Sequence, residues 1–125
     1  MRGREVLRLP HYFLFLFLTL KRKENPFVAK LESKFQKELM DEIRDTYPGC
    51  VIFKNDSGYI QGFPDWTILY RDKWAVLECK RSRTAPKQPN QDYYVERLDG
   101  MSFSRFVYPE NMDEVLYELH LHFTN

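Results

Sequence analysis

Residues 65–80 decide the fold and read DWTILYRDKWAVLECK. Two runs rich in β-branched and aromatic residues, 65–70 and 73–80, are separated by Arg71-Asp72, and this pattern predicts a β-hairpin. If those two residues form the whole loop, the pairs of opposing residues follow by counting outward. A loop one residue longer would turn each pair into diagonal neighbours, since Arg-Asp is not the Asn-Gly signal that fixes a two-residue loop.

Counting from the two-residue loop places Asp65 opposite Glu78, and opposing residues project from the same face of a sheet. Side chains alternate along a strand, so Lys80 shares that face with Glu78. Two opposed carboxylates destabilise a sheet unless something neutralises them, and Mg²⁺ binds carboxylate oxygens well. The alternative is a surface ion pair of Glu78 with Lys80 and a turn residue at Asp65, which leaves the clustering unexplained.

A third acid, Glu32, lies in the helix predicted before the hairpin. It falls in the same helical row as Val28, Phe35 and Leu39, which are expected to face the sheet. A carboxylate buried there needs a cationic partner or a metal ion. The alternative is that Glu32 lies at the edge of the apolar stripe and reaches solvent.

The whole chain predicts an α/β (α+β) fold with one central mixed four-stranded sheet flanked by helices, in the order αβββαβα. Gly100 is expected to end the second helix as a C-terminal glycine, and Asn111 to cap the last helix in a capping box with Glu114. The expected elements are a helix from residue 27 to 47, strands at 50–54, 65–70 and 73–80, a helix at 89–98, a strand at 105–108 and a helix after 111.

Length and composition limit the number of domains and the kinds of partner that the chain can have. The 125 residues suffice for one domain, and a net charge of +1 does not by itself indicate a nucleic-acid partner. Cys50 and Cys79 have neither disulfide nor zinc spacing, which favours free thiols. Residues 1–26 combine basic residues with an apolar run too short to span a membrane. We expect a non-core extension there, with an added strand or a membrane-directed segment as alternatives, and the domain itself at residues 27–125.

Gly62-Phe63-Pro64-Asp65 followed by Glu78-Cys79-Lys80 resembles the PD-(D/E)xK nuclease superfamily, which has a restriction-endonuclease-like core. The glycine before Pro-Asp and the small size are most similar to its VRR-nuclease and Holliday-junction resolvase branches, including compact phage endonucleases. The resemblance extends over about residues 27–120. Members carry an acid on the preceding helix, which Glu32 matches, and often a glutamine and a tyrosine on the following helix.

The resemblance implies a division of roles among these residues. Asp65 and Glu78 would hold Mg²⁺ or Mn²⁺, together with the backbone carbonyl of Cys79 and with Glu32 directly or through water. Lys80 would orient the attacking water or stabilise negative charge, and Glu32 counts with these three as a catalytic candidate. The residues expected to contact nucleic acid are Arg81, Arg83 and Lys87 of a basic loop, which could equally be a solvated loop, and Gln91 and Tyr94 of the following helix.

The function expected from the resemblance is metal-dependent hydrolysis of phosphodiester bonds in DNA by an endonuclease, with branched DNA as one option. DNA is then the expected partner, the cytoplasm (of the host, if the protein is viral) the expected location, and a homodimer stays open. We expect no membrane association and no small-molecule cofactor. The alternatives are a nucleic-acid-binding module that does not cleave, and a membrane-tethered accessory protein resting on residues 1–25.

Overall fold

Helix α3 (Pro26–Thr46) forms because apolar residues recur along it at helical spacing and bury one face. Leu31, Phe35, Leu39, Met40 and Ile43 are buried, while the polar residues between them are partly or fully exposed. The helix gives way to a turn at 47–49, where Gly49 has a φ of 90°. The computed structural model describes residues 26–56 and 58–125, so the prediction of an N-terminal extension lies almost entirely outside the described residues.

The remaining elements follow the predicted order. Strands β1 and β2 pair antiparallel, β2 and β3 pair antiparallel, and β3 and β4 pair parallel, which gives a mixed sheet in the order β1-β2-β3-β4. The predicted fold class is therefore confirmed. The elements after α3 are β1 (Val51–Lys54), β2 (Trp66–Tyr70), β3 (Lys73–Cys79), α4 (Gln91–Met101), β4 (Ser104–Val107), a 3₁₀ turn (Pro109–Asn111) and α5 (Met112–Thr124).

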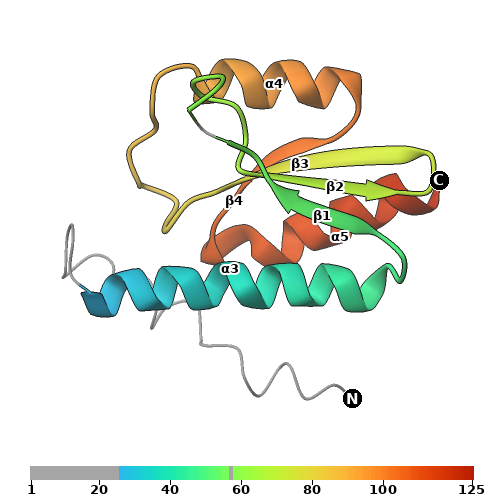
Figure 1. The fold of residues 1–125 in the computed structure, drawn as a ribbon, viewed down its shortest axis with the longest axis horizontal. Helices are drawn as coiled ribbons and strands as arrows, with labels where there is room; N and C mark the ends of the chain where they lie inside the picture. The colour runs from blue at the N-terminus through green and yellow to red at the C-terminus, as the bar shows by residue number, and fades with distance from the viewer. Residues whose placement is uncertain (1–25, 57) are drawn as a thin grey trace.

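The sheet separates two layers of helix (Figure 1). Helices α3 and α5 lie on one face, where their apolar side chains form the core with Ile68, Ala75 and Leu77 of the central strands. Helix α4 lies on the other face and contacts β3 and β4. It is the crossover that joins these two parallel strands, as parallel pairing requires.

The β2–β3 hairpin has the predicted two-residue loop. Tyr70 lies opposite Lys73, and Trp66 lies opposite Leu77 at the other end of the ladder. Arg71 takes the left-handed conformation, with a φ of 57°, and its guanidinium lies 4.9 Å from the centroid of the Tyr70 ring. This register is the one on which the proposed pairing of the two acids depends.

Two predictions about helix ends are wrong. Gly100 lies inside α4, which continues to Met101, and the backbone N–H of Ser102 closes the helix by donating to the carbonyl of Leu98 at 3.0 Å. Asn111 precedes α5 without a side-chain capping bond. Its amide instead accepts from the N–H of Tyr108 at 2.9 Å and donates to the carbonyl of Phe106 at 3.0 Å, which secures the chain as it leaves β4.

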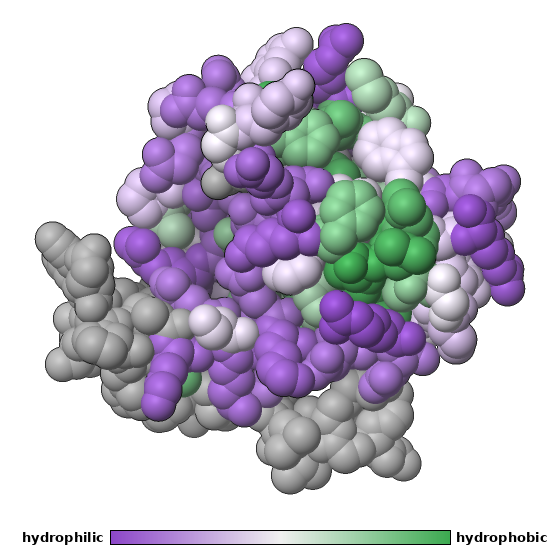
Figure 2. Space-filling model, in the orientation of Figure 1, coloured by the Kyte–Doolittle hydropathy of each residue, from purple (hydrophilic) through white to green (hydrophobic). Residues whose placement is uncertain are grey.

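Helix α4 leaves part of its face of the sheet uncovered. Val51, Phe53 and Leu69 on β1 and β2 are 53%, 45% and 41% exposed, and β1 is an edge strand of the described sheet. Figure 2 shows an apolar patch right of centre, where β1 lies in Figure 1. Among the helices of the described residues, none is long and apolar enough to cross a membrane.

Candidate active site

Asp65 and Glu78 meet at the end of the β2–β3 hairpin that lies opposite the loop. Continuing the ladder one step beyond Trp66 and Leu77 places the two acids across from each other. The Asp65 carboxylate accepts a hydrogen bond from the backbone N–H of Cys79 at 3.2 Å, which fixes it beside the third strand. The structure thus brings together the two acids that the sequence paired.

The Glu78 carboxyl is buried in an unfavourable setting for a negative charge. The residue is only 4% exposed, and burial together with the nearby charge of Asp65 raises the pKa of Glu78 to about 8. One carboxyl oxygen, Oε2, accepts a hydrogen bond, whereas Oε1 is buried without a hydrogen-bond partner among the described residues. A buried polar oxygen of this kind costs free energy unless another group satisfies it.

Gln91, the first residue of α4, is the partner of Glu78. Its side-chain N–H donates to Glu78 Oε2 at 2.9 Å, and its carbonyl oxygen accepts from the backbone N–H of Gln88 at 2.8 Å. The sequence placed Gln91 among the DNA-contacting residues, but the structure buries it, with 7% exposed, against the acid. It therefore orients Glu78. The register of α4 against β3 decides this contact, and no local pattern in the sequence encodes it.

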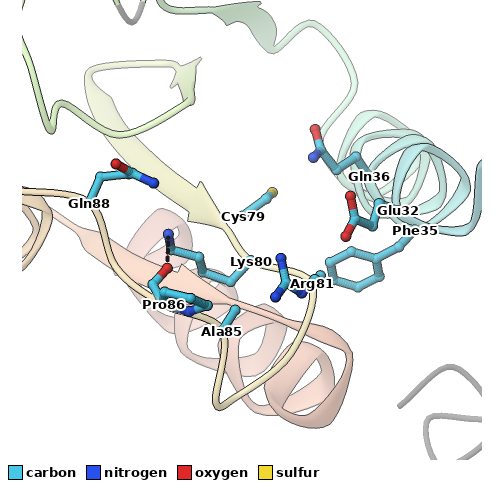
Figure 3. Close-up of a pocket in the computed structure, with 9 residues that line it drawn as sticks. All are labelled: Glu32, Phe35, Gln36, Cys79, Lys80, Arg81, Ala85, Pro86 and Gln88. Carbon is cyan, nitrogen blue, oxygen red and sulfur yellow. Dashed lines mark hydrogen bonds between the residues drawn. The ribbon is translucent and has the colours of Figure 1, made fainter. Parts of the chain in front are cut away.

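Lys80 follows β3 directly and faces the loop that leads to α4. Its ammonium group donates to the carbonyl of Pro86 at 3.0 Å, so the loop folds back over the end of the strand (Figure 3). Partial burial lowers the pKa of Lys80, while Glu78 and Asp65 oppose that change. A cavity of about 220 Å³ opens here and is lined by Glu32, Phe35, Gln36, Cys79, Lys80, Arg81, Ala85, Pro86 and Gln88.

Glu32 enters this cavity from α3, on the opposite face of the sheet from α4. Its carboxylate and the Arg81 guanidinium point toward each other across the cavity (Figure 3). Partial burial raises the pKa of Glu32, and the Arg81 charge works against that rise. Nowhere in residues 26–56 and 58–125 do three His, Cys, Asp or Glu side chains gather in an arrangement that could hold a metal ion. A direct metal contact by Glu32 therefore stays a prediction.

The other predicted nucleic-acid contacts lie around the same end of the sheet. Arg83 and Lys87 are exposed, with their charged groups 5.3 Å and 4.3 Å from the ring centroids of Tyr108 and Phe106. Lys87 also pairs with Asp92 at 2.8 Å. The half-buried Tyr94 ring lies 5.9 Å from that of Phe63, at the turn before the Pro-Asp pair.

Cys79, the last residue of β3, lies between Glu78 and Lys80 but is part of the core. Its side chain is 8% exposed, and burial raises the pKa of the thiol well above its usual range. A thiol that stays protonated is a poor nucleophile. Its backbone N–H, not its sulfur, serves the site through Asp65.

Gly62 joins the loop that carries Asp65 to the start of α4. It has a φ of 91°, and a Cβ atom there would lie 2.7 Å from the backbone of Pro89 and Asn90. We therefore expect Gly62→Ala to cost about 2–3 kcal/mol in the free energy of unfolding, from left-handed strain and steric overlap. Thermal denaturation measures this as a fall in Tm of about 10 °C.

Gly100→Ala is the matched control for Gly62→Ala. A Cβ at Gly100 meets nothing within 4 Å, and the residue lies in a helix. Alanine should stabilise that position by about 0.5–1 kcal/mol. Equal Tm values for the two variants would contradict the proposed close packing at Gly62.

Comparison with known proteins bears on the fold. No protein-family model matches the chain, and no curated protein matches it. Among solved structures, a chain described as a VRR_NUC domain superposes with a TM-score of 0.54 and 22% sequence identity, over 69% of this chain and 94% of that one. The predicted resemblance is thus confirmed at the level of architecture. The chain shares the fold of this VRR_NUC domain.

Proposed function

We propose that this protein is a divalent-metal-dependent nuclease that hydrolyses phosphodiester bonds in DNA, with Asp65 and Glu78 as its metal-binding acids. The observation that carries the proposal is the buried acid pair: a carboxyl oxygen of Glu78 lies buried without a hydrogen-bond partner among the described residues, beside the Asp65 carboxylate. The likeness to a VRR_NUC domain, a nuclease by its name, supports this choice.

The residues present fit a hard cation. Mg²⁺ is commonly held by one or two carboxylates, with water and substrate phosphates as its other ligands. Asp65 and Glu78 supply the two carboxylates, and the Cys79 carbonyl is the further oxygen that we propose. A divalent cation bound here would polarise the phosphate and lower the pKa of a bound water. Glu32 would contribute through water, from the other side of the cavity.

The chain's own residues prepare the site for this chemistry. Gln91 holds Glu78 by one oxygen, which leaves Oε1 directed to a ligand. The N–H of Cys79 holds Asp65 in the same way. Lys80, which now donates to the Pro86 carbonyl, would turn its ammonium group to the phosphoryl oxygens, where negative charge develops during hydrolysis.

A module that only binds DNA has no need of two acids and a lysine in one cluster, since a buried acid pair destabilises the fold. The branched-DNA option rests on likeness alone, and a substrate panel tests it. We expect the purified protein with Mg²⁺ or Mn²⁺ to cut at least one of duplex, flap, four-way-junction and single-stranded DNA. EDTA should abolish the activity. Absence of cleavage across the whole panel with either metal would contradict the proposal.

Metal binding can be measured without cleavage. Saturating Mg²⁺ or Mn²⁺ at about 100 times its Kd should stabilise the wild-type protein by about 2.7 kcal/mol, which raises Tm by several degrees. Asp65→Asn should lose most of this rise because it removes one ligand charge. Asp92→Asn, an exposed acid on α4, is the matched control and should keep it. The same metal-induced shift in both variants would exclude Asp65 from the metal site.

A further inference from the structure

A second cavity, of about 470 Å³, adjoins the first along α3. Both cavities are lined by Glu32 and Gln36, so they lie side by side along α3, and only the first is lined by Lys80 and Arg81. We call the second cavity the α3 groove. It is lined by Glu32, Ser33, Gln36, Lys37, Met40, Arg44, Lys54 and Trp66.

The α3 groove carries an excess of positive charge. Three cations, Lys37, Arg44 and Lys54, line it together with one acid, Glu32. Lys80 and Arg81 extend the row of cations toward the acid pair. Asp41 offsets part of this charge, because it pairs with Lys37 at 2.7 Å and with Arg44 at 3.5 Å. Lys54 lies on the other wall, 5.4 Å from the centroid of the Trp66 ring. Cations spaced along a groove are what a phosphodiester backbone requires.

Trp66 supplies an aromatic surface in the same groove. Its indole N–H donates to the side-chain oxygen of Gln36 at 3.2 Å, which fixes the ring against α3. The groove's floor is the apolar side chain of Met40, which is 2% exposed. A fixed aromatic ring among cations is the combination by which proteins hold single-stranded nucleic acid, because bases stack on the ring while cations follow the backbone.

The groove connects to the proposed catalytic centre through adjacent residues. Trp66 follows Asp65 directly, and side chains alternate along a strand. The Asp65 carboxylate therefore faces α4, while the Trp66 indole faces α3 and bonds to Gln36. A strand that passes round the end of β2 would meet both. From Glu32 to Arg44 the helix extends about 18 Å at 1.5 Å per residue, long enough for several nucleotides.

We propose that the α3 groove binds one unpaired nucleic-acid strand as it continues from the catalytic centre. A base would stack on Trp66 in place of Lys54, which lies over the ring in the free protein, and Lys54 would turn to a phosphate, as would Arg44. This inference rests on the proposed nuclease function and adds a substrate feature to it. The preferred substrates would then carry single-stranded segments next to the scissile bond.

Fluorescence anisotropy of a labelled single-stranded oligonucleotide measures its binding to the full chain. With EDTA present to prevent cleavage, this measurement tests whether the groove cations contact the strand. Arg44→Ala/Lys54→Ala should weaken binding about tenfold and reduce the slope of log K against log salt by about 1.4, which corresponds to two phosphate contacts. Lys34→Ala/Arg71→Ala removes the same charge outside the groove and should change both quantities much less. Equal effects of the two double variants would overturn the proposal.

Tryptophan fluorescence tests the base contact. The chain has two tryptophans, so Trp74→Phe leaves Trp66 as the single reporter. The oligonucleotide should quench the tryptophan fluorescence of this variant. The fluorescence of Trp66→Phe, which comes from Trp74, should stay almost unchanged. Equal quenching of both variants, or none in Trp74→Phe, would exclude stacking on Trp66.

The two proposals fail in different ways. If the wild-type protein showed no metal-dependent cleavage but the anisotropy results were as expected, the nuclease function would be rejected and the strand-binding groove would stand. Cleavage with unchanged binding by Arg44→Ala/Lys54→Ala would leave the nuclease function and remove the groove. The binding of a blunt duplex serves as a further control. If Arg44→Ala/Lys54→Ala weakened duplex binding as much as single-strand binding, the assignment to one unpaired strand would be overturned.

Discussion

Glu78→Gln should yield a protein that is more stable than the wild type and catalytically inactive. In the absence of metal, burial and the Asp65 charge oppose ionisation of Glu78, whose pKa is raised to about 8. Glutamine has the same shape and no charge. Its carbonyl oxygen can accept from Gln91, and its amide can donate to Asp65 at every pH, which the carboxyl can do only while it is protonated. At pH 7 in EDTA we expect a gain of about 3 kcal/mol in the free energy of unfolding.

The stability gain of Glu78→Gln should depend on pH in a defined direction. The pKa of Glu78 in the folded protein lies above the ordinary value of 4.5 for a glutamate, so the wild type loses stability as pH rises from 4.5 toward 8. Urea denaturation in EDTA should therefore show almost no difference between the two proteins near pH 4 and a growing difference up to pH 8. A gain that is the same at every pH would show that it arises from packing and not from the charge.

Cleavage by Glu78→Gln should fall by at least about a thousandfold, because the variant loses a carboxylate ligand of the proposed metal site. Glu96→Gln makes the same change at an exposed position of α4 and should retain activity and stability. Near-normal cleavage by Glu78→Gln would end the proposed role of this acid, whatever its effect on folding.

Lys80→Met should lower kcat by about 10²–10³-fold with little change in KM. Methionine keeps the apolar stem that lines the cavity and removes the ammonium group, which we propose to meet the charge that develops on the phosphoryl oxygens. The stabilisation by Mg²⁺ should remain, because both acids are intact. Steady-state kinetics and thermal denaturation with and without metal separate these effects.

Lys87→Met is the matched control for Lys80. Lys87 is an exposed cation of the same loop and is paired with Asp92. If it contacts the DNA backbone as proposed, its loss should raise KM and leave kcat nearly unchanged. Retention of full kcat by Lys80→Met would remove Lys80 from the catalytic step.

The features that the sequence predicted correctly depend on local patterns. Apolar spacing located α3, and the two-residue break at Arg71-Asp72 determined the register that pairs Asp65 with Glu78. Once a short loop closes a hairpin, every opposing pair follows by counting. The metal-binding role of these residues was inferred from their chemistry and from family resemblance, and it stays a proposal.

The features that the sequence did not predict depend on which hydrogen-bond partners the folded chain offers. The bond of Gln91 to Glu78 requires the position of α4 over β3, which is determined by packing across the whole face. Asn111 has the residue type of a helix cap, but the preceding turn offers its amide two better-placed backbone groups. Glycine is common just after the last residue of a helix, which is why Gly100 was expected to end α4. The hydrogen bond from the Ser102 N–H to the Leu98 carbonyl instead closes the helix beyond it. The Gln91 bond is thus a tertiary contact, whereas at both helix ends one local hydrogen bond replaces another that the residue type favours.

The short β2–β3 loop also has a practical consequence. Arg71 and Asp72 are exposed and lie at the end of the sheet farthest along the hairpin from Asp65 and Glu78. A cysteine introduced at position 72 would provide an attachment point for a fluorophore or a solid support. A molecule immobilised there would present its acid pair to the solution, so that single molecules could be observed as they meet DNA.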